Sequence, residues 1–381
     1  MTSESMTPNE RLWAAMRLEK PDRVPVVPTM TPESDGGLLG ISMAEVQSSN
    51  DIALEACLRV FDEFGGWDSV IDFPYTVPHR HALQINPMKT RIPGRDLPDD
   101  YMAQLVEEEV MKFEDYDTIC EKGFNSFYYE DYLWRITDMR PEDLPRTVQE
   151  AIDVSSRLTQ ELAKRGVKPF IMQVGCMHPV FLLSQIRSLT AFTRDMYFHP
   201  DTVERTIRRM TDDVLQLMIP RARELGAKAG SFVEERASAF YYPLPAFERF
   251  WWPYFEEITD AFWSEGVVSI WHLDTCWNKN LPYFKRVPRG SLVLEFDGTT
   301  DIFLAKEILR DHQCIYGDVP ASLLTVGSPQ DVEAYCKKLI DAIGGDGGFI
   351  LGSGCCVPPT CTRDNFRAMI ETAKTYELSK N

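Results

Sequence analysis

Nine side chains that could do acid–base or metal chemistry lie at or just after the ends of short apolar runs in this sequence. They are Glu234, Glu235, His272, Asp274, Cys276, Asp297, Asp318, Cys355 and Cys356. One imidazole, one or two thiolates and a carboxylate form a ligand set that Zn²⁺ accepts in proteins. The sequence therefore predicts a zinc site, provided that the fold brings the ends of these runs together.

Three of these candidates follow one another closely. His272, Asp274 and Cys276 are two residues apart, so they would share one face of a strand. If the chain turns at Thr275, only His272 and Asp274 share that face. Cys355 follows Gly-Ser-Gly and precedes Val-Pro-Pro, which predicts that it faces an opening. The alternative for His272 and Cys355 is a hydrogen-bonded histidine and a packed thiol, because a buried cysteine is most often a small apolar filler.

Two further groups could contact a small molecule. Residues 240–255 are dense in aromatic side chains, and Tyr241 and Tyr242 among them could line the pocket of a flat organic compound. Core packing on an amphipathic helix is the alternative for the aromatics after Ala246. His79, in the segment PHRHALQ, could also touch a substrate, although the sequence gives it no evident partner.

Strand and helix patterns alternate along the chain that must position these groups. Short apolar or β-branched runs occur at residues 23–29, 69–74, 169–175, 229–235, 267–274, 291–298, 314–319 and 348–354, and amphipathic stretches of helical period separate most of them. Eight such units predict an α/β fold, a (β/α)8 TIM barrel. Reacting groups in such a barrel lie where strands end and loops begin.

The spacing of the runs is uneven, because about 95 residues separate the second run from the third. Residues from about 75 to 168 are interpreted as an insertion between the second and third strands. A single domain then spans residues 1–381, since no Gly/Ser linker bounds the insertion. Within it, residues 102–115 alternate as a strand pair would, residues 128–144 have the character of a polar connection, and residues 146–166 have a helical pattern.

Composition limits the partners and the compartment. The chain has 58 acidic against 40 basic residues and a formal charge of −18, so nucleic acid and an anionic membrane surface are not expected partners. No apolar run approaches the roughly 18 to 20 residues that span a bilayer, and the N-terminus has no signal-peptide pattern. The nine scattered cysteines predict reduced thiols in a cytoplasmic protein. A reducing compartment also disfavours a vicinal disulfide between Cys355 and Cys356.

The chain resembles the uroporphyrinogen decarboxylase superfamily in four segments: TPNERLWAAMRLEKPDRVPVVP, LPAFERFWWPYFEEITDAFWSEG leading into IWHLD, YGDVPASLLTVGSPQDVE, and GFILGSGCCVPPTCTRDNFRAMIETAK. The resemblance implies a (β/α)8 barrel with an N-terminal helical extension, here residues 1–22. Decarboxylases of this superfamily carry an arginine-rich signature after the first strand, whereas the matching segment here, PTMTPESDGGLLG, has no arginine. The other branch comprises corrinoid-dependent methyltransferases that bind zinc through a histidine and a cysteine, and His272 and Cys355 fall on those positions.

Within that branch, the thiol-methylating members have a tight His-x-Cys, and this sequence has Asp274 at the cysteine position. The departure makes the chain similar to the methyltransferase component of anaerobic O-demethylases. The resemblance then implies that a methyl group passes from a methoxylated aromatic compound to the cobalt(I) of a corrinoid carried by a separate protein that docks transiently. Zinc would act as a Lewis acid at the ether oxygen. A homodimer is left open.

The resemblance also distributes roles among the candidates. His272 and Cys355 are expected zinc ligands, with Glu234, Glu235, Asp274 and Cys276 competing for the remaining protein position. Proton transfer or ring orientation is expected of Asp274, Asp297 and Asp318, and contact with the small-molecule methyl donor of Tyr241, Tyr242 and His79.

Three alternatives remain at this point. The enzyme could use another methyl donor or acceptor, such as a methylamine, methanol, a thiol or tetrahydrofolate. A decarboxylase would need cationic side chains at the barrel mouth, for which Arg236 and Arg363 are the candidates. A non-catalytic corrinoid or small-molecule binding module need hold no zinc.

Overall fold

The computed structural model describes residues 5–169 and 174–376. Strands occur at the positions of all eight predicted runs: β1 (Thr29–Met30), β2 (Ile71–Asp72), β5 (Gly175–Met177), β6 (Ala229–Glu234), β7 (Val268–Leu273), β8 (Leu292–Phe296), β9 (Cys314–Val319) and β10 (Phe349–Ser353). Residues 170–173 of the predicted third run lie outside the described residues. The prediction of an α/β fold with parallel strands in chain order is confirmed.

Six of these strands form one parallel sheet in the order β10-β9-β8-β7-β6-β5, and β1 pairs with β2 in a second parallel sheet. A parallel bridge between Val26 and Leu351 joins the segment before β1 to β10. The strands thus follow one another from β5 round to β2. Among the described residues, β2 and β5 are not paired.

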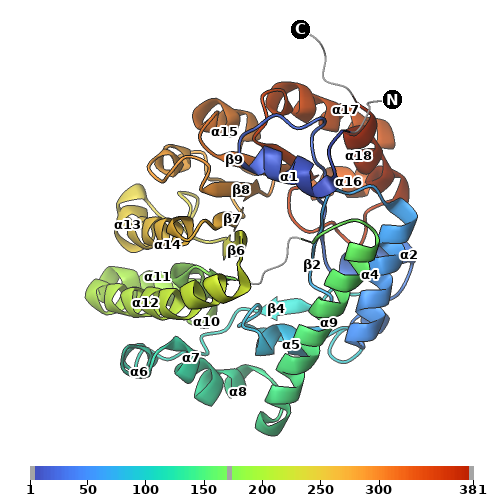
Figure 1. Ribbon diagram of the computed structural model, residues 1–381. Helices are drawn as coiled ribbons and strands as arrows, with labels where there is room; N and C mark the ends of the chain where they lie inside the picture. Colours follow the sequence, from blue (N-terminus) through green and yellow to red (C-terminus); the bar gives the residue numbers. More distant parts are fainter. Residues whose placement is uncertain (1–4, 170–173, 377–381) are drawn as a thin grey trace.

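Helices cover the outside of this arrangement (Figure 1). Those that connect successive strands include α4 (Asn50–Phe64), α12 (Pro200–Leu225), α14 (Trp252–Ser264), α15 (Ile302–Leu309) and α17 (Pro329–Leu339), with α18 (Arg363–Thr375) after β10. Shorter helices sit at the strand ends: α2 (Pro32–Leu39), α3 (Met43–Val46), α10 (Pro179–Ile186), α11 (Leu189–Phe198), α13 (Leu244–Phe250), η3 (Leu281–Lys285), α16 (Ala321–Val326) and η4 (Ile340–Gly344). Among the described residues, no helix combines the length and apolar character needed to cross a bilayer.

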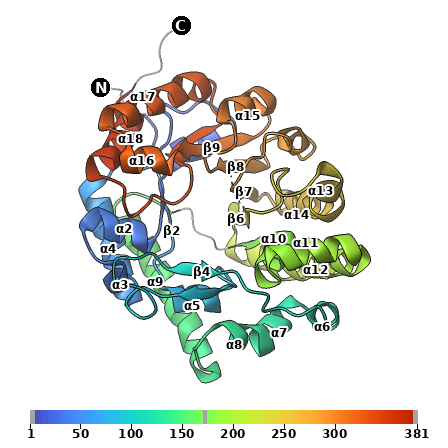
Figure 2. The same cartoon turned by 180° about the vertical axis from the view of Figure 1, so that it is seen from behind.

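The N-terminal helix α1 (Pro8–Met16) begins with a capping box between Thr7 and Glu10. Its Leu12 and Met16 join the smaller of two core clusters, together with inward-facing strand residues such as Ile270 and Val293. In Figure 1, α1 lies across the strands in the foreground, and in the opposite view of Figure 2 it is hidden behind them. The helix therefore covers the end of the arrangement at which the strands begin.

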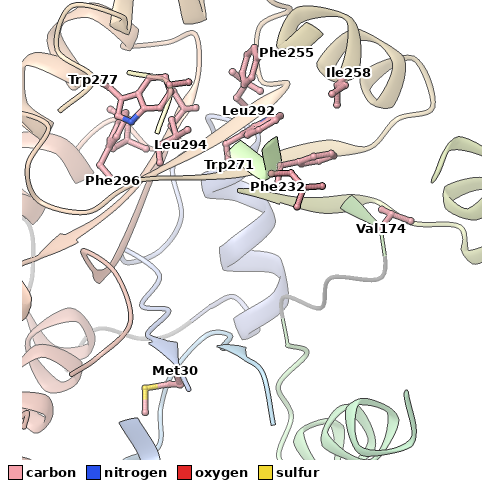
Figure 3. Packing of buried hydrophobic residues seen from close by; sticks show 14 of the residues in the cluster. Met30, Val174, Phe232, Phe255, Ile258, Trp271, Trp277, Leu292, Leu294 and Phe296 are labelled. Atoms are coloured by element: carbon pink, nitrogen blue, oxygen red, sulfur yellow. The ribbon is translucent and has the colours of Figure 1, made fainter. Parts of the chain in front are cut away.

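The larger core cluster lies between the sheet and its outer helices and is rich in aromatic rings. Trp271 on β7 stacks on Phe232 of β6, with ring centroids 4.9 Å apart, and lies 4.6 Å from Phe255 of α14. Figure 3 shows these rings together. Because side chains alternate across a strand, the outward position of Trp271 turns the next residue, His272, toward the inside.

Residues between β2 and β5 form α5 (Val77–Ala82), β3 (Lys89–Arg91), β4 (Gln104–Val106), α6 (Asp115–Lys122), α7 (Phe124–Phe127), η1 (Tyr128–Tyr132), α8 (Leu133–Ile136), η2 (Pro141–Asp143) and α9 (Leu144–Lys164). The prediction of a helix at 146–166 is confirmed by α9. The prediction of a strand pair within 102–115 is wrong, because only β4 lies there and its antiparallel partner is β3. Residues 128–144 are largely helical rather than a polar connection, because Tyr128, Tyr132 and Leu133 are buried in the core.

Candidate metal centre

His272 is held by a carboxylate beneath it. Its Nδ1 lies 2.9 Å from Oε2 of Glu295, the residue opposite it in the register of β7 and β8. The other oxygen of Glu295 accepts a 2.7 Å hydrogen bond from the Thr29 hydroxyl, which also lies 2.9 Å from the hydroxyl of Tyr316. A carboxylate on one ring nitrogen fixes the orientation of the imidazole. The other nitrogen, Nε2, is thereby directed at the remaining groups of the site.

Two predicted residues meet His272 at this nitrogen. Nε2 lies 3.1 Å from Oδ1 of Asp274 and 3.7 Å from Sγ of Cys355. The three potential ligand atoms all lie within 4.8 Å of one another. We call His272, Asp274 and Cys355 the strand-end cluster, because they come from the C-terminal ends of β7 and β10.

The strand-end cluster fits a metal ion chemically as well as geometrically. Nitrogen, oxygen and sulfur donors from three protein residues, with one position left for substrate or water, are typical of catalytic zinc. Oδ1 of Asp274 is buried and has no hydrogen-bond partner among the described residues, although His272 Nε2 lies 3.1 Å away as an ion-pair partner. A buried acceptor without a donor is costly, and a bound cation would satisfy it.

Electrostatics around the cluster favour a cation. Burial lowers the pKa of His272, but Glu295 and Asp274 more than compensate and the pKa is raised well above its ordinary value. Burial raises the pKa of Glu235 to about 7, with a further contribution from the charge of Asp274. The pKa of Cys355 is raised by its hydrogen bond with Cys356 and by burial, and a bound metal would reverse this because a coordinating thiol is deprotonated.

The structure separates two adjacent glutamates that the sequence treats as equivalent. Glu234 is opposite Leu273 in the register of β6 and β7 and is fully buried on the helix side of the sheet, where it accepts hydrogen bonds from Trp251 Nε1 (2.7 Å) and the Arg236 amide (2.8 Å). Burial raises its pKa to about 8. It is not brought into the cluster. Glu235 is close enough to Asp274 for their charges to interact.

Cys276 is also left out of the strand-end cluster. Thr275 has a φ of 71°, so the chain leaves the extended conformation there and the alternation that would align Cys276 with His272 is lost. Asp297 stabilises this turn: its carboxylate accepts hydrogen bonds from the Thr275 amide (2.8 Å) and from the Thr299 amide (2.9 Å). The structure therefore places Asp297 as a residue that shapes the loop beside the cluster.

Asp318 lies at the end of β9 and is 2% exposed. One oxygen accepts a 2.8 Å hydrogen bond from the Tyr335 hydroxyl. Burial raises its pKa to about 7, and the nearby charge of Asp297 contributes in the same direction. Such a carboxyl group can hold or release a proton near neutral pH.

The three expected substrate residues, Tyr241, Tyr242 and His79, differ in their exposure and their partners. Tyr242 is buried, with its hydroxyl 3.2 Å from that of Thr193. Tyr241 is 37% exposed and packs edge-on against Phe240, with ring centroids 5.0 Å apart. His79 binds Glu150 of α9 through Nε2, at 3.0 Å, and is not brought into the strand-end cluster.

Two charged residues were missed by sequence reasoning, and the first of them, Glu295, contacts His272. Glu295 stands inside an apolar strand, and its acidic side chain in a fully buried run was the signal that could have found it. Arg80 lies in the segment PHRHALQ between two histidines and pairs with Glu33 of α2 at 3.1 Å. No sequence signal distinguished Arg80 from a surface arginine.

Comparisons with known proteins agree on one family. The sequence signature of the uroporphyrinogen decarboxylase (URO-D) family matches residues 129–376. The chain is 25% identical over 377 residues to methylcobamide:CoM methyltransferase MtbA of Methanosarcina mazei, covering 97% of this chain and 98% of that protein. The MtbA of Methanosarcina acetivorans is 26% identical over 154 residues, which are 40% of this chain and 44% of that protein. A solved methyltransferase from Methanosarcina mazei shares the fold, with a TM-score of 0.69 at 16% identity over 97% of this chain and 99% of its own.

Proposed function

Because this chain belongs to the uroporphyrinogen decarboxylase family, and within it resembles the corrinoid-dependent methyltransferase branch, we propose that it is a zinc-dependent methyltransferase. Its methyl donor is a methoxylated aromatic compound, and the acceptor is the cobalt(I) of a corrinoid protein. The observation that carries the proposal is the strand-end cluster, which offers one nitrogen, one oxygen and one sulfur ligand within 4.8 Å.

The oxygen ligand favours an ether over a thiol as the reacting group. Asp274 takes the place of a thiolate in the ligand set, and a carboxylate oxygen is a harder ligand than sulfur. A metal with fewer thiolate ligands retains more of its positive charge for a hard oxygen donor. When bound, zinc would supply Lewis-acid stabilisation of the phenolate oxygen that leaves as the methyl group is transferred.

The protein's own residues orient the imidazole of His272 and supply a proton to the leaving oxygen. Glu295 holds His272 so that Nε2 faces Asp274 and Cys355. Burial raises the pKa of Glu235 to about 7, with a contribution from the charge of Asp274, so Glu235 is the proposed proton donor to the phenolate oxygen near neutral pH. Burial also raises the pKa of Asp318 to about 7, and its carboxylate is bound to Tyr335 of α17. Tyr241, partly exposed in the loop after β6, can stack against the aromatic ring.

Decarboxylation, the reaction for which the family is named, is less well supported than methyl transfer. Decarboxylases of the family carry an arginine-rich signature after the first strand. The corresponding segment of this chain, after β1, contains no arginine. Arg236 and Arg363 are both bound to glutamates, Glu107 and Glu63. A tetrapyrrole polyacid would therefore lack the cluster of cations that its carboxylates need.

A second candidate function is methyl transfer from methylcobamide to a thiol. The relative from Methanosarcina mazei is named for that activity and covers nearly the whole chain. The presence of Asp274 rather than cysteine two residues after His272 argues against it.

The test is metal analysis of the purified protein followed by methylation of a cobalt(I) corrinoid with a panel of donors. We expect about one zinc per chain and methyl transfer from guaiacol-like methoxyarenes. An active preparation that uses methanol, methylamines or methyltetrahydrofolate and ignores every methoxyarene would overturn the choice of donor. Methylation of a thiol by methylcobamide would support the second candidate, and a protein that binds corrinoid but holds no zinc would be a binding module.

The proposal includes a fold, a compartment and a partner. We propose that the strands close into a (β/α)8 barrel within a single domain and that the enzyme works in the cytoplasm. The corrinoid protein would dock transiently over the C-terminal strand ends through an interface below about 1,200 Å². Methylation rates measured against the concentration of that partner at several ionic strengths would show whether charge steers the association.

A further inference from the structure

Tyr316 is a fully buried residue on β9 to which the proposed mechanism gives no task. We propose that Tyr316 is a positioning residue of the metal centre. Its hydroxyl, acting through Thr29, holds the histidine and the cysteine of the strand-end cluster at a fixed separation. This inference rests on the metal site of the proposed function, and adds the residues that keep the ligands in place before a metal binds.

The register of three strands places Tyr316 in one row with the metal-binding histidine. His272 on β7 is opposite Glu295 on β8, and Glu295 is opposite Tyr316 on β9. The three strands follow one another in the sheet (Figure 2). Because side chains alternate across a strand, residues in register on neighbouring parallel strands share a face. Tyr316 therefore lies on the same inner face as the site.

The hydroxyl of Tyr316 reaches the segment that leads into β1. It donates a 2.9 Å hydrogen bond to the carbonyl of Val27 and lies 2.9 Å from the hydroxyl of Thr29. Burial and the charge of Glu295 raise the pKa of Tyr316 well above its ordinary value, so the hydroxyl keeps its proton at neutral pH. It can hold its neighbours in place but is not suited to exchange a proton with a substrate.

A glycine on β10 makes this reach possible. Gly352 belongs to the strand between β9 and the segment before β1. A Cβ atom at this position would lie 2.3 Å from Cε2 of Tyr316 and 2.6 Å from the carbonyl oxygen of Val27. Both distances are far inside van der Waals contact, so any larger residue would push the ring aside. Gly352 thus lets the tyrosine side chain cross the strand that leads to the cysteine ligand.

Thr29 connects Tyr316 with the histidine ligand. The Thr29 hydroxyl donates to Oε1 of Glu295 at 2.7 Å, and Oε2 of Glu295 lies 2.9 Å from Nδ1 of His272. The hydroxyl of Thr29 therefore lies between a carboxylate that it supports and the hydroxyl of Tyr316. Without the Tyr316 hydroxyl, Thr29 would lose one of the two polar contacts of its side chain, and its bond to Glu295 would be less well fixed.

The backbone of Thr29 is bound on both sides of the cysteine ligand. Its amide donates to Oγ of Ser353 at 3.2 Å, and its carbonyl accepts a 2.9 Å hydrogen bond from the amide of Val357. Ser353 lies two residues before Cys355, and Val357 lies two residues after it. A displacement of Thr29 would therefore be transmitted to both ligand-bearing segments.

The alternative is a role in packing alone, because Tyr316 belongs to the smaller core cluster. In that case, loss of the hydroxyl would cost stability and leave the metal unaffected. The chain offers a matched control for this alternative in Tyr132 of η1. That residue is also buried, and its hydroxyl donates to the carbonyl of Pro87 at 3.0 Å, within the insertion.

The test is the zinc affinity of Tyr316→Phe and Tyr132→Phe, measured by competition with a chelator. Each variant removes one buried hydroxyl that is bound to a backbone carbonyl, so urea unfolding should show similar losses of stability. We expect Tyr316→Phe also to lower zinc affinity by about 3- to 10-fold, the effect of one hydrogen bond, whereas Tyr132→Phe should keep the native affinity. Cobalt(II) bound in place of zinc gives a second readout, because its visible absorption depends on coordination geometry. That spectrum should change in Tyr316→Phe alone.

A double variant tests whether Thr29 is the link. Thr29→Val and Tyr316→Phe act on the same contact, so their combination should lower zinc affinity by no more than about twofold beyond Thr29→Val alone. Losses that multiply would overturn the route through Thr29. If Tyr316→Phe does not fold, Gly352→Ala carries the same expectation, because it keeps the hydroxyl and displaces the ring.

The remaining outcomes separate this inference from the proposed function. Native zinc affinity and a native cobalt spectrum in Tyr316→Phe would overturn the positioning role, and so would an equal loss of affinity in Tyr132→Phe. A native protein that holds zinc and demethylates no methoxyarene would overturn the proposed donor, while a selective loss of affinity in Tyr316→Phe would still support the role of Tyr316. A native protein that binds no metal through His272 and Cys355 would overturn both.

Discussion

Charged groups are buried at both ends of the strands. They are paired with opposite charges at one end, and negative groups are in excess at the other. At the end where the strands begin, Asp68 accepts hydrogen bonds from Arg11, from Arg23 and from the Val26 amide. Arg11 also binds Asp22 through Nε at 2.6 Å and the carbonyl of Met6 through Nη2 at 2.9 Å. Every charge named here has at least one opposite charge in contact.

At the end where the strands finish, one imidazole faces several carboxylates. His272 contacts Glu295 and Asp274, and the charges of Glu235 and Asp297 lie nearby. No described residue donates a hydrogen bond to Oδ1 of Asp274. Negative groups exceed positive ones in this site.

The contrast separates a stabilising network from a binding site. The paired charges around Asp68 connect α1 and the segments before β1 and β2 to one another. The excess of acceptors around His272 is unfavourable for the empty fold and becomes favourable when a cation binds. Substitutions should therefore damage the fold at one end and the metal site at the other.

The largest expected effect is loss of the metal. His272→Ala and Cys355→Ala each remove one of three ligands, so zinc content should fall from about one per chain to near zero, and methyl transfer should fall to background. Unfolding by urea should be little changed relative to the metal-free native protein. The control is Cys120→Ala on α6, a free cysteine remote from the cluster, which should keep its zinc. Full zinc occupancy in both ligand variants would show that the metal lies elsewhere.

The second largest effect is the loss of stability expected when the paired charges around Asp68 are separated. Asp68→Ala leaves Arg11 and Arg23 buried without their shared carboxylate, and should lower the free energy of unfolding by about 3 to 5 kcal/mol. Folded molecules should still bind zinc. Asp51→Ala breaks an exposed pair with Arg157 and should cost less than about 1 kcal/mol. Equal costs for the two variants would mean that the network around Asp68 adds no more than a surface ion pair.

A smaller effect, on the pH dependence of stability, is expected at Asp318, whose carboxylate accepts a hydrogen bond from Tyr335. Its pKa is raised to about 7 by burial, against roughly 3.9 in an unfolded chain. Native stability from this group is therefore fully present below pH 4 and is lost as the pH rises through 7. Asp318→Asn removes the titration, so its stability relative to the native protein should rise between pH 4 and 7 and level off above. Urea unfolding at several pH values measures this, and a constant difference would mean that Asp318 has an ordinary pKa.

The sequence was informative where a local pattern determines the structure. All eight strand positions follow from short apolar runs, and the pairing of His272 with Asp274 follows from strand alternation. Cys355 could be placed because the glycines before it and the prolines after it favour an exposed loop. These inferences need only the period of a strand and the fact that parallel strands end on one side.

Other features depend on tertiary contacts that no local pattern contains. Glu234 and Glu235 are adjacent, and only the register of β6 against β7 decides which of them faces the cluster. A turn at Thr275 that leaves out Cys276 was one of two alternatives from the sequence, and without a glycine or asparagine at that position the sequence could not decide between them. The ion pair between Arg80 and Glu33, 47 residues earlier, is likewise a tertiary contact.

The smallest expected effect concerns Glu295, the carboxylate that supports His272. Glu295 and Asp68 are both buried acids, but Asp68 completes a network of cations whereas Glu295 orients a ligand. Glu295→Gln keeps an acceptor for the imidazole and removes the charge, so zinc affinity should fall by about 10- to 100-fold. The free energy of unfolding of the metal-free protein should fall by less than in Asp68→Ala, because the glutamine still accepts a hydrogen bond from the imidazole and His272 keeps Asp274 as a charged partner. Competition with a zinc-binding chelator measures the affinity.

Thr29→Val is the control variant, because it removes only the hydroxyl that donates to Glu295; we expect it to lower zinc affinity less than Glu295→Gln does. Unchanged zinc affinity in Glu295→Gln would mean that the β7 backbone alone orients His272; a large loss of metal-free stability would mean that Glu295 belongs with Asp68 as a structural charge.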